Sequence, residues 1–277
     1  MKTMLVLSMG ALLLAGTLSA QTPVPEWQAG VDKMKSLIQT NPAQASEEVG
    51  ELLKGKNKKN VDLVTSVAHV YLDAGKLTEA QEYLAMAKKA DNKDPKVSVL
   101  EGDIALAQKN IGQACQLYEQ AIYFDPNCKE AYLKYAQAYK SASPALAIEK
   151  LEQLKAVDPN CLEADRELAE VYYSSNRFGK AAEMYAKFID TPLATEDDML
   201  KYAFALFLNH DFEKSLQVAQ KGLQKNARHA AFNRLVMYNN TDLKRYEDAE
   251  KAAHAFFNAS DRADYSYLDY RYYGALL

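Results

Sequence analysis

Apolar and small residues recur along the chain in six short blocks. Each block begins with an apolar or ring residue and ends three positions later with a small one: LTEA at 77–80, IGQA at 111–114, PALA at 144–147, FGKA at 178–181, FEKS at 212–215 and YEDA at 246–249. The final residues of the blocks are separated by 34, 33, 34, 34 and 34 positions. This period predicts an array of helix–turn–helix units, in which small side chains let paired helices approach closely.

Other positions keep the same period. Two blocks end in the sequence Asp-Pro-Asn-Cys, at residues 125–128 and 158–161, where proline cannot continue a helix. Each repeat is therefore expected to consist of two helices of roughly 12–14 residues joined by tight turns. Small residues also stand twelve positions before the last residue of a block, and large ones four positions after it: Ala68, Gly102, Ala169 and Ala203, then Leu84, Tyr118, Leu151 and Tyr185.

The pattern resembles the tetratricopeptide repeat family over about residues 61–277. The clearest match to the family pattern consists of Leu168, Ala169, Tyr172, Ala181, Tyr185 and Phe188. The leading tryptophan of that pattern is replaced in every block. The resemblance implies an all-α fold, a right-handed α-α superhelix of antiparallel helix pairs.

The first twenty residues have the pattern of a secretory signal peptide. Lys2 precedes an apolar run at 4–18, and Ser19 and Ala20 precede the expected cleavage site. A retained membrane anchor is less consistent with the pattern, because the run is shorter than the roughly 20 residues that a span needs. No cysteine follows the run closely, which disfavours a lipid anchor. The mature chain is expected in the periplasm or cell envelope.

The rest of the chain divides into three parts. Residues 21–60 are expected to form a degenerate helix pair, 61–266 six repeats, and 267–277 the first helix of a truncated further repeat. Five tyrosines lie in the last thirteen residues. Either the natural protein continues into more repeats, or this helix packs on a partner, because a solenoid end needs a polar cap.

The net charge of the chain narrows the class of partner. Without Lys2, 32 basic residues face 37 acidic ones, a formal charge of −5, which argues against nucleic acid and anionic membranes as partners.

The cysteines, Cys115, Cys128 and Cys161, are expected to be free thiols. Stacked helices lie about 8–10 Å apart, whereas a disulfide needs Cα atoms within about 7 Å.

The sequence contains no recognisable catalytic or metal-binding motif. The four histidines lie in four different repeats, and there is no HExxH, phosphate-binding glycine loop or nucleophile elbow. We therefore expect no catalysis, no cofactor and no metal. A hydrolase with an unrecognised site would need a clustered acid–base pair. The histidines are His69, His210, His229 and His254.

The resemblance places the partner site on the inner face of the solenoid, where the first helices of this family contact their ligands. In the early repeats it implies groove positions such as Asp62, Thr65, His69, Lys96 and Val99. Binding hot spots are enriched in aromatic residues and arginine. The candidate site is the part of the groove that is rich in both: Arg166, Tyr173, Phe204, Phe207, Arg234 and Tyr238. The hypothesis is that apolar side chains of a peptide or helix pack on the phenylalanines and its carboxylates bind the arginines.

These observations favour an exported protein-interaction scaffold that binds a protein or peptide. The alternative is an accessory or substrate-binding subunit for glycan or outer-membrane assembly machinery, because aromatic residues in a groove would also suit sugars. The two phenylalanines also fit a simple role in the core.

Overall fold

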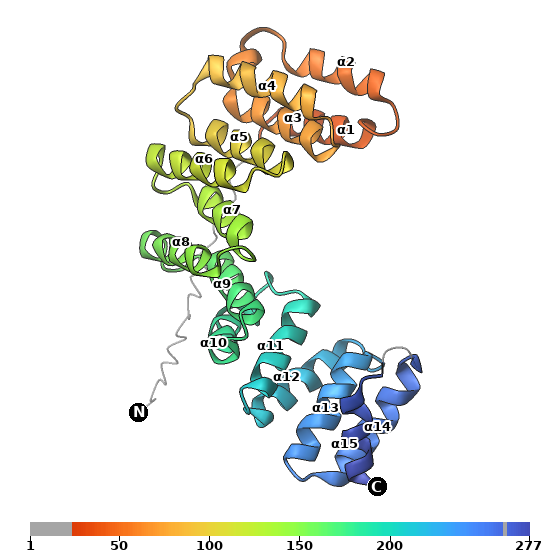
Figure 1. The fold of residues 1–277 in the computed structure, drawn as a ribbon. Coiled ribbons are helices and arrows are strands. Elements are labelled where there is room, and N and C mark those ends of the chain that lie inside the picture. Colours follow the sequence, from red (N-terminus) through yellow and green to blue (C-terminus); the bar gives the residue numbers. More distant parts are fainter. Residues whose placement is uncertain (1–23, 263–264) are drawn as a thin grey trace, which may run out of the picture.

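The computed structural model describes residues 24–262 and 265–277. Within these ranges the chain forms fifteen α-helices, one short 3-10 helix and no β-strand, so the predicted all-α class is confirmed. The helices stack in chain order into a curved solenoid (Figure 1). The predicted signal peptide, residues 1–20, lies outside the described residues.

Six helix pairs form the body of the solenoid. Each second helix packs on its own first helix and on the first helix of the next pair. The first helices are α3 (Val61–Asp73), α5 (Pro95–Ala107), α7 (Lys129–Tyr139), α9 (Leu162–Ser174), α11 (Glu196–Leu208) and α13 (Ala230–Asp242). The second helices are α4 (Leu77–Ala90), α6 (Ile111–Phe124), α8 (Pro144–Val157), α10 (Phe178–Phe188), α12 (Phe212–Lys225) and α14 (Tyr246–Ala259).

Shorter elements stand at both ends of this body. At the N-terminal end, α1 (Gln28–Leu37) packs on α2 (Pro42–Leu52) and α3, and η1 (Gly55–Lys59) contacts α3 and α4. At the C-terminal end, α15 (Tyr267–Leu276) packs on α13 and α14, as the first helix of another pair would.

The periodic small residues lie at the contacts between paired helices. Ala80, Ala114, Ala147 and Ala181 are all 0% exposed, which confirms their predicted burial. At Gly102 an added Cβ atom would lie 2.5 Å from the ring of Tyr118. These helices approach too closely for a larger side chain, and this contact gives the sequence its period.

The turn inside most pairs contains one residue in the left-handed conformation. The next residue then donates its N–H back into the first helix, as from Asp211 to the carbonyl of Leu206 at 2.9 Å. This bond caps the helix C-terminus, a position that favours glycine. The α7–α8 turn, which belongs to the repeat one residue shorter, has no such residue. The left-handed residues are Gly75, Lys109, Asn176, His210 and Lys244.

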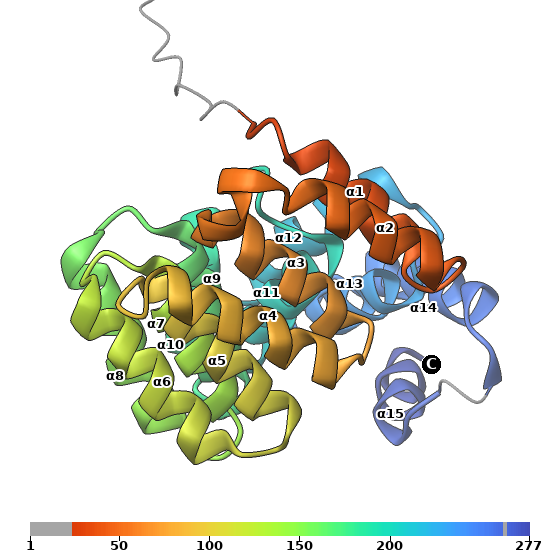
Figure 2. The ribbon, with the colours of Figure 1, turned by 90° about the horizontal axis from the view of Figure 1, so that it is seen from above.

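The stacked pairs curve around an open side. In Figure 1 the second helices α6 and α8 lie on the outer side of the curve, and the first helices α7 and α9 lie nearer its inside. Seen from above, α13–α15 lie on the opposite side from α5–α8 (Figure 2). Buried apolar residues form a succession of clusters along the stack, as expected when each repeat contacts only its neighbours. Among the described helices, none is long and apolar enough to cross a membrane.

Candidate functional site

The six predicted site residues all lie on first helices, two on each of three. Arg166 and Tyr173 belong to α9, Phe204 and Phe207 to α11, and Arg234 and Tyr238 to α13. The structure separates them into residues that hold the repeats together and residues with accessible surface.

Each arginine binds a carboxylate on the next first helix along the chain. Arg166 places Nε 3.0 Å from Oδ1 of Asp198 and Nη2 3.0 Å from its Oδ2. Arg234 places Nε 2.8 Å from Oδ1 of Asp269 and Nη2 3.1 Å from its Oδ2. The two aspartate side chains are 1% and 0% exposed. A partner's carboxylate would therefore have to displace Asp198 or Asp269 from these arginines.

The two aspartates also cap the helices that carry them. Asp198 and Thr195 form a capping box at the start of α11, and Asp269 and Ser266 form another at the start of α15. A carboxylate there also interacts favourably with the helix dipole. Burial raises the pKa of Asp269, but hydrogen bonds from the Ser266 backbone, Tyr238 and Arg234 outweigh burial and hold the pKa below its usual value.

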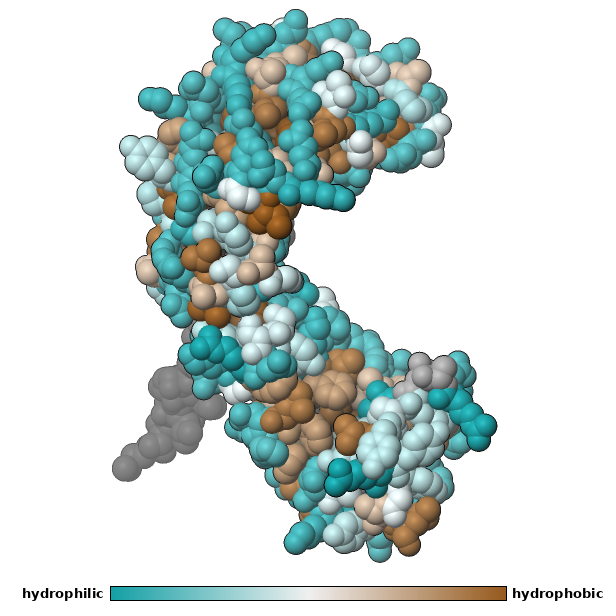
Figure 3. Space-filling model, viewed as in Figure 1, coloured by the Kyte–Doolittle hydropathy of each residue, from teal (hydrophilic) through white to brown (hydrophobic). Residues whose placement is uncertain are grey.

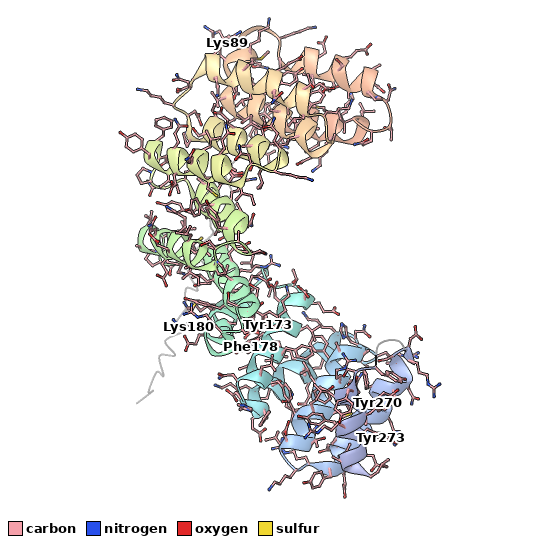
Figure 4. The ribbon with its side chains drawn as sticks, in the orientation of Figure 1. Lys89, Tyr173, Phe178, Lys180, Tyr270 and Tyr273 are labelled. Atoms are coloured by element: carbon pink, nitrogen blue, oxygen red, sulfur yellow. The ribbon has the colours of Figure 1, made fainter. Side chains whose placement is uncertain are left out.

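The aromatic members of the predicted site differ in accessibility. Tyr238 is only 3% exposed, and its hydroxyl donates to Oδ1 of Asp269 at 2.7 Å, so it is a packing residue. Tyr173, Phe204 and Phe207 are half-buried. Tyr173 packs edge-on against Phe178 with ring centroids 5.7 Å apart, and the two lie together in Figure 4.

A row of rings links three successive first helices. The rings of Phe207 and Tyr238 have centroids 5.6 Å apart, and those of Tyr238 and Tyr272 are stacked at 4.2 Å. Phe204 packs against the same cluster. We call these four residues the aromatic strip. Beside it Leu208 is 43% exposed, and Figure 3 shows hydrophobic surface gathered in the region of α11–α13.

A hollow of about 350 Å³ adjoins the aromatic strip between α13 and α15. Tyr272 forms part of its wall and donates from its hydroxyl to Oδ2 of Asp242 at 2.8 Å. The other lining residues are Thr241, Leu268, Arg271 and Ala275. Tyr272 therefore belongs both to the aromatic strip and to the wall of this hollow.

The early repeats present a polar surface instead. A hollow of about 330 Å³ is lined by the predicted groove positions of α3 and α5 together with Pro25, Trp27, Ser66 and Glu130. Asp103 below it accepts from Tyr118 at 2.7 Å, and it lies 3.0 Å from His69 and 2.8 Å from Lys134. Burial raises the pKa of Asp103, but these partners outweigh burial and lower it. Most charges here already have partners within the chain.

The described residues contain no group of three or more metal-ligating side chains. The three thiols are unbonded, two of them buried. Burial raises the pKa of Cys115 to about 11 and also raises that of Cys161. These thiols are therefore protonated at neutral pH and are poor nucleophiles.

Comparison with known proteins agrees with this architecture. Residues 67–129 and 137–194 match the family model described as tetratricopeptide repeat. The matched residues make up less than half of the chain, and over them the comparison supports the tetratricopeptide repeat. Folds of this type bind protein or peptide partners, and proteins of the family are generally non-catalytic scaffolds. A search of the curated proteins returned no match.

Solved structures are similar in fold. The C-terminal part of a repeat-containing protein from Cytophaga hutchinsonii has 17% identity and a TM-score of 0.63, covering 87% of this chain and 98% of that one. PilF from Pseudomonas aeruginosa has 16% identity and a TM-score of 0.60, with coverage of 80% and 99%. PilW, described as a type IV pilus biogenesis factor, has 17% identity and a TM-score of 0.57, with coverage of 74% and 95%. At such identities the likeness concerns the fold.

Sequence reasoning found the inner-face rings but missed the carboxylates that bind the arginines. The signal was present, because Thr195-x-x-Asp198 and Ser266-x-x-Asp269 both precede helical segments. This motif identifies the start of a helix, however, and does not reveal that Asp198 pairs with Arg166 one repeat earlier. Tyr272 was likewise not assigned to the strip, since its register depends on how α15 docks on α13.

Proposed function

We propose that this chain is a non-catalytic scaffold of the cell envelope that binds a segment of a partner protein over the aromatic strip. The observation that carries the proposal is the row of rings on three successive first helices, beside exposed Leu208. Phe204, Phe207 and Tyr272 are the partly exposed rings of this row, and buried Tyr238 packs between them. Partly exposed rings in a groove supply apolar area at low entropic cost and are enriched among binding hot spots. The arginines contribute indirectly, because they hold the helices that present the rings.

The location belongs to the proposal as well. The apolar run at 4–18 supports export, and the formal charge of the remaining chain fits a protein partner better than a nucleic acid. Similarity in fold to PilF and to PilW, described as a type IV pilus biogenesis factor, makes an accessory part in an envelope assembly machinery a second candidate. The recess beside Tyr272 would then receive a segment of an assembling protein.

Site-specific crosslinking tests the proposed surface. A photoreactive phenylalanine analogue replaces Leu208 beside the strip, and in a control chain it replaces Tyr123, which is 82% exposed on α6. Envelope extract from the encoding organism supplies the candidates. We expect the Leu208 probe to form a discrete adduct with an identifiable protein that the Tyr123 probe does not form.

A double variant, Phe204→Ala with Phe207→Ala, measures the contribution of the rings. Hot-spot truncation costs at least about 2 kcal/mol, so affinity for the captured protein should fall more than tenfold. The control is Tyr123→Ala, which should retain full affinity. Full affinity of the double variant, with its helix content and melting temperature preserved, would place the site elsewhere on the chain.

A further inference from the structure

The outer face of the solenoid contains grooves between successive second helices. The first helix that lies between them forms the floor of each groove. The groove bounded by α12 and α14 over α13 has a volume of about 510 Å³. The groove one repeat earlier, bounded by α10 and α12 over α11, has about 320 Å³. Figure 1 shows α13 between α12 and α14, and α13 packs on both.

The wider groove results from smaller side chains at equivalent positions. Seven residues of the earlier lining have a counterpart 34 positions later in the wider one, because the repeats have equal length. Five of these positions carry a smaller side chain in the later groove, among them Val236 in place of Tyr202, Ala252 in place of Val218 and Ala255 in place of Lys221. The ring of Tyr202, which is buried in the earlier repeat, has no counterpart in the later groove.

The floor of the wider groove also holds a polar side chain without a partner. Asn240 is 3% exposed and lines the groove, and its amide makes no hydrogen bond to any part of the chain that the structure describes. The equivalent residues in the two preceding repeats are Leu206 and Tyr172, both buried and largely apolar. The side-chain amide is not fully shielded from solvent, and it lines the groove. A ligand in the groove can therefore pair with it directly.

We propose that the groove between α12 and α14 binds an extended peptide segment of a partner protein. A tyrosine-sized side chain of the peptide packs on Val236, in the place that Tyr202 fills one repeat earlier. The peptide group beside it pairs with Asn240, whose carboxamide offers both a donor and an acceptor. Val236 and Asn240 are one helical turn apart, about 6 Å, so one peptide residue reaches both.

The lining fits a peptide segment without strong charge. Leu216 and Val236 are 5% and 8% exposed and give the floor its apolar area. At one end Arg245 binds Glu213 at 2.6 Å, so the rim there is already neutralised. The site is independent of the aromatic strip, because Val236 and the strip residue Tyr238 are two positions apart on α13 and therefore point to opposite sides of the helix.

Nuclear magnetic resonance of the chain from Gln21 to Leu277 tests the proposal with a defined probe. The probe is the tripeptide glycyl-tyrosyl-glycine, blocked by an acetyl group and an amide, and the control probe has alanine at its centre. We expect the tyrosine peptide to shift the side-chain amide signal of Asn240 and the backbone signals of α12–α14 with millimolar affinity. The alanine peptide should bind at least tenfold more weakly.

Two variants assign the effect to this groove. Val236→Tyr restores the ring of the earlier repeat, and Asn240→Leu restores its apolar floor, so each should weaken binding at least tenfold. The double variant Phe204→Ala with Phe207→Ala should bind the peptide as the unaltered chain does. The proposal is overturned if the tyrosine peptide causes no shifts in α12–α14, or if both groove variants bind it unchanged. Loss of binding in the phenylalanine variant alone would assign the peptide to the aromatic strip.

Discussion

Replacing Asp269 by asparagine should release α15 from the end of the solenoid. Asp269 is fully buried and accepts hydrogen bonds from Arg234, from the Tyr238 hydroxyl at 2.7 Å and from the backbone and hydroxyl of Ser266 at 2.6 and 2.9 Å. An asparagine offers one acceptor oxygen and no charge, so these donors lose most of their partner. Because α15 contacts only α13 and α14 extensively, the loss falls on the docking of this helix.

The free-energy cost of this substitution follows from the burial of the Arg234–Asp269 ion pair. Removing one member of a buried ion pair costs about 3–5 kcal/mol. Arg234 is 21% exposed, so water can hydrate its guanidinium group in the variant and offset part of this cost. We therefore expect a destabilisation of about 3 kcal/mol. That free energy corresponds to roughly a hundredfold change in an opening equilibrium. Repeats in a solenoid are coupled mainly to their neighbours, so the earlier repeats should change little.

Hydrogen exchange of backbone amides measures this opening directly. In the variant the amides of α15 should exchange roughly a hundredfold faster, while those of α3–α10 keep their rates. The control is Asp261→Asn, because Asp261 is exposed. Unchanged protection of α15 in Asp269→Asn would refute the role given to this carboxylate.

The same carboxylate predicts a pH dependence with a definite sign. The pKa of Asp269 is lowered in the folded chain, so its contribution is complete above the unfolded value of about 3.9 and is lost as the pH falls through the folded value. Protection of α15 in the unaltered chain should therefore persist at pH 5 and weaken below about pH 4. In Asp269→Asn that extra acid sensitivity should be absent.

Three further predictions concern the body of the solenoid. Ala147→Leu should overpack a fully buried contact and lower stability by about 1–3 kcal/mol, read from the denaturation midpoint. Gly222→Ala should also lower it, because a Cβ atom there would lie 2.5 Å from the ring of Phe232, whereas Gly274→Ala, with no atom within 4 Å, should leave stability equal or raise it by up to about 1 kcal/mol. All three thiols should react with a thiol reagent after denaturation, and buried Cys161 should be protected before it; a disulfide in the folded chain would contradict this.

The repeat architecture was predictable because its cause is local and repeated. A small residue such as Ala147 is needed wherever two helices meet closely, and the same requirement recurs in each pair. The residues with left-handed backbone angles in the turns were harder to predict from the sequence. Lys109 and His210 adopt left-handed angles that glycine would signal more clearly, because the backbone bond that closes the turn holds residues of several types.

The six residues predicted for the inner face lie on the first helices α9, α11 and α13, but the sequence did not reveal the carboxylates that bind two of them. Arg166 and Arg234 look like open hot-spot residues in one sequence, since a pairing over 32 or 35 positions leaves no local pattern. The sequence also could not decide whether Phe204 and Phe207 are partly exposed or belong to the core, because a helix in a solenoid is apolar on more than one side.

The grooves of the outer face show a third limit, which concerns comparison within the chain. Val236 and Asn240 are unremarkable residues alone, and their meaning appears only against Tyr202 and Leu206 at the same places one repeat earlier. A solenoid supplies its own reference states, because equal backbones carry different side chains. Where one repeat narrows a groove with a tyrosine and the next leaves it wider with a polar side chain in its lining, the difference identifies a candidate ligand site, and the period of 34 residues makes the comparison possible.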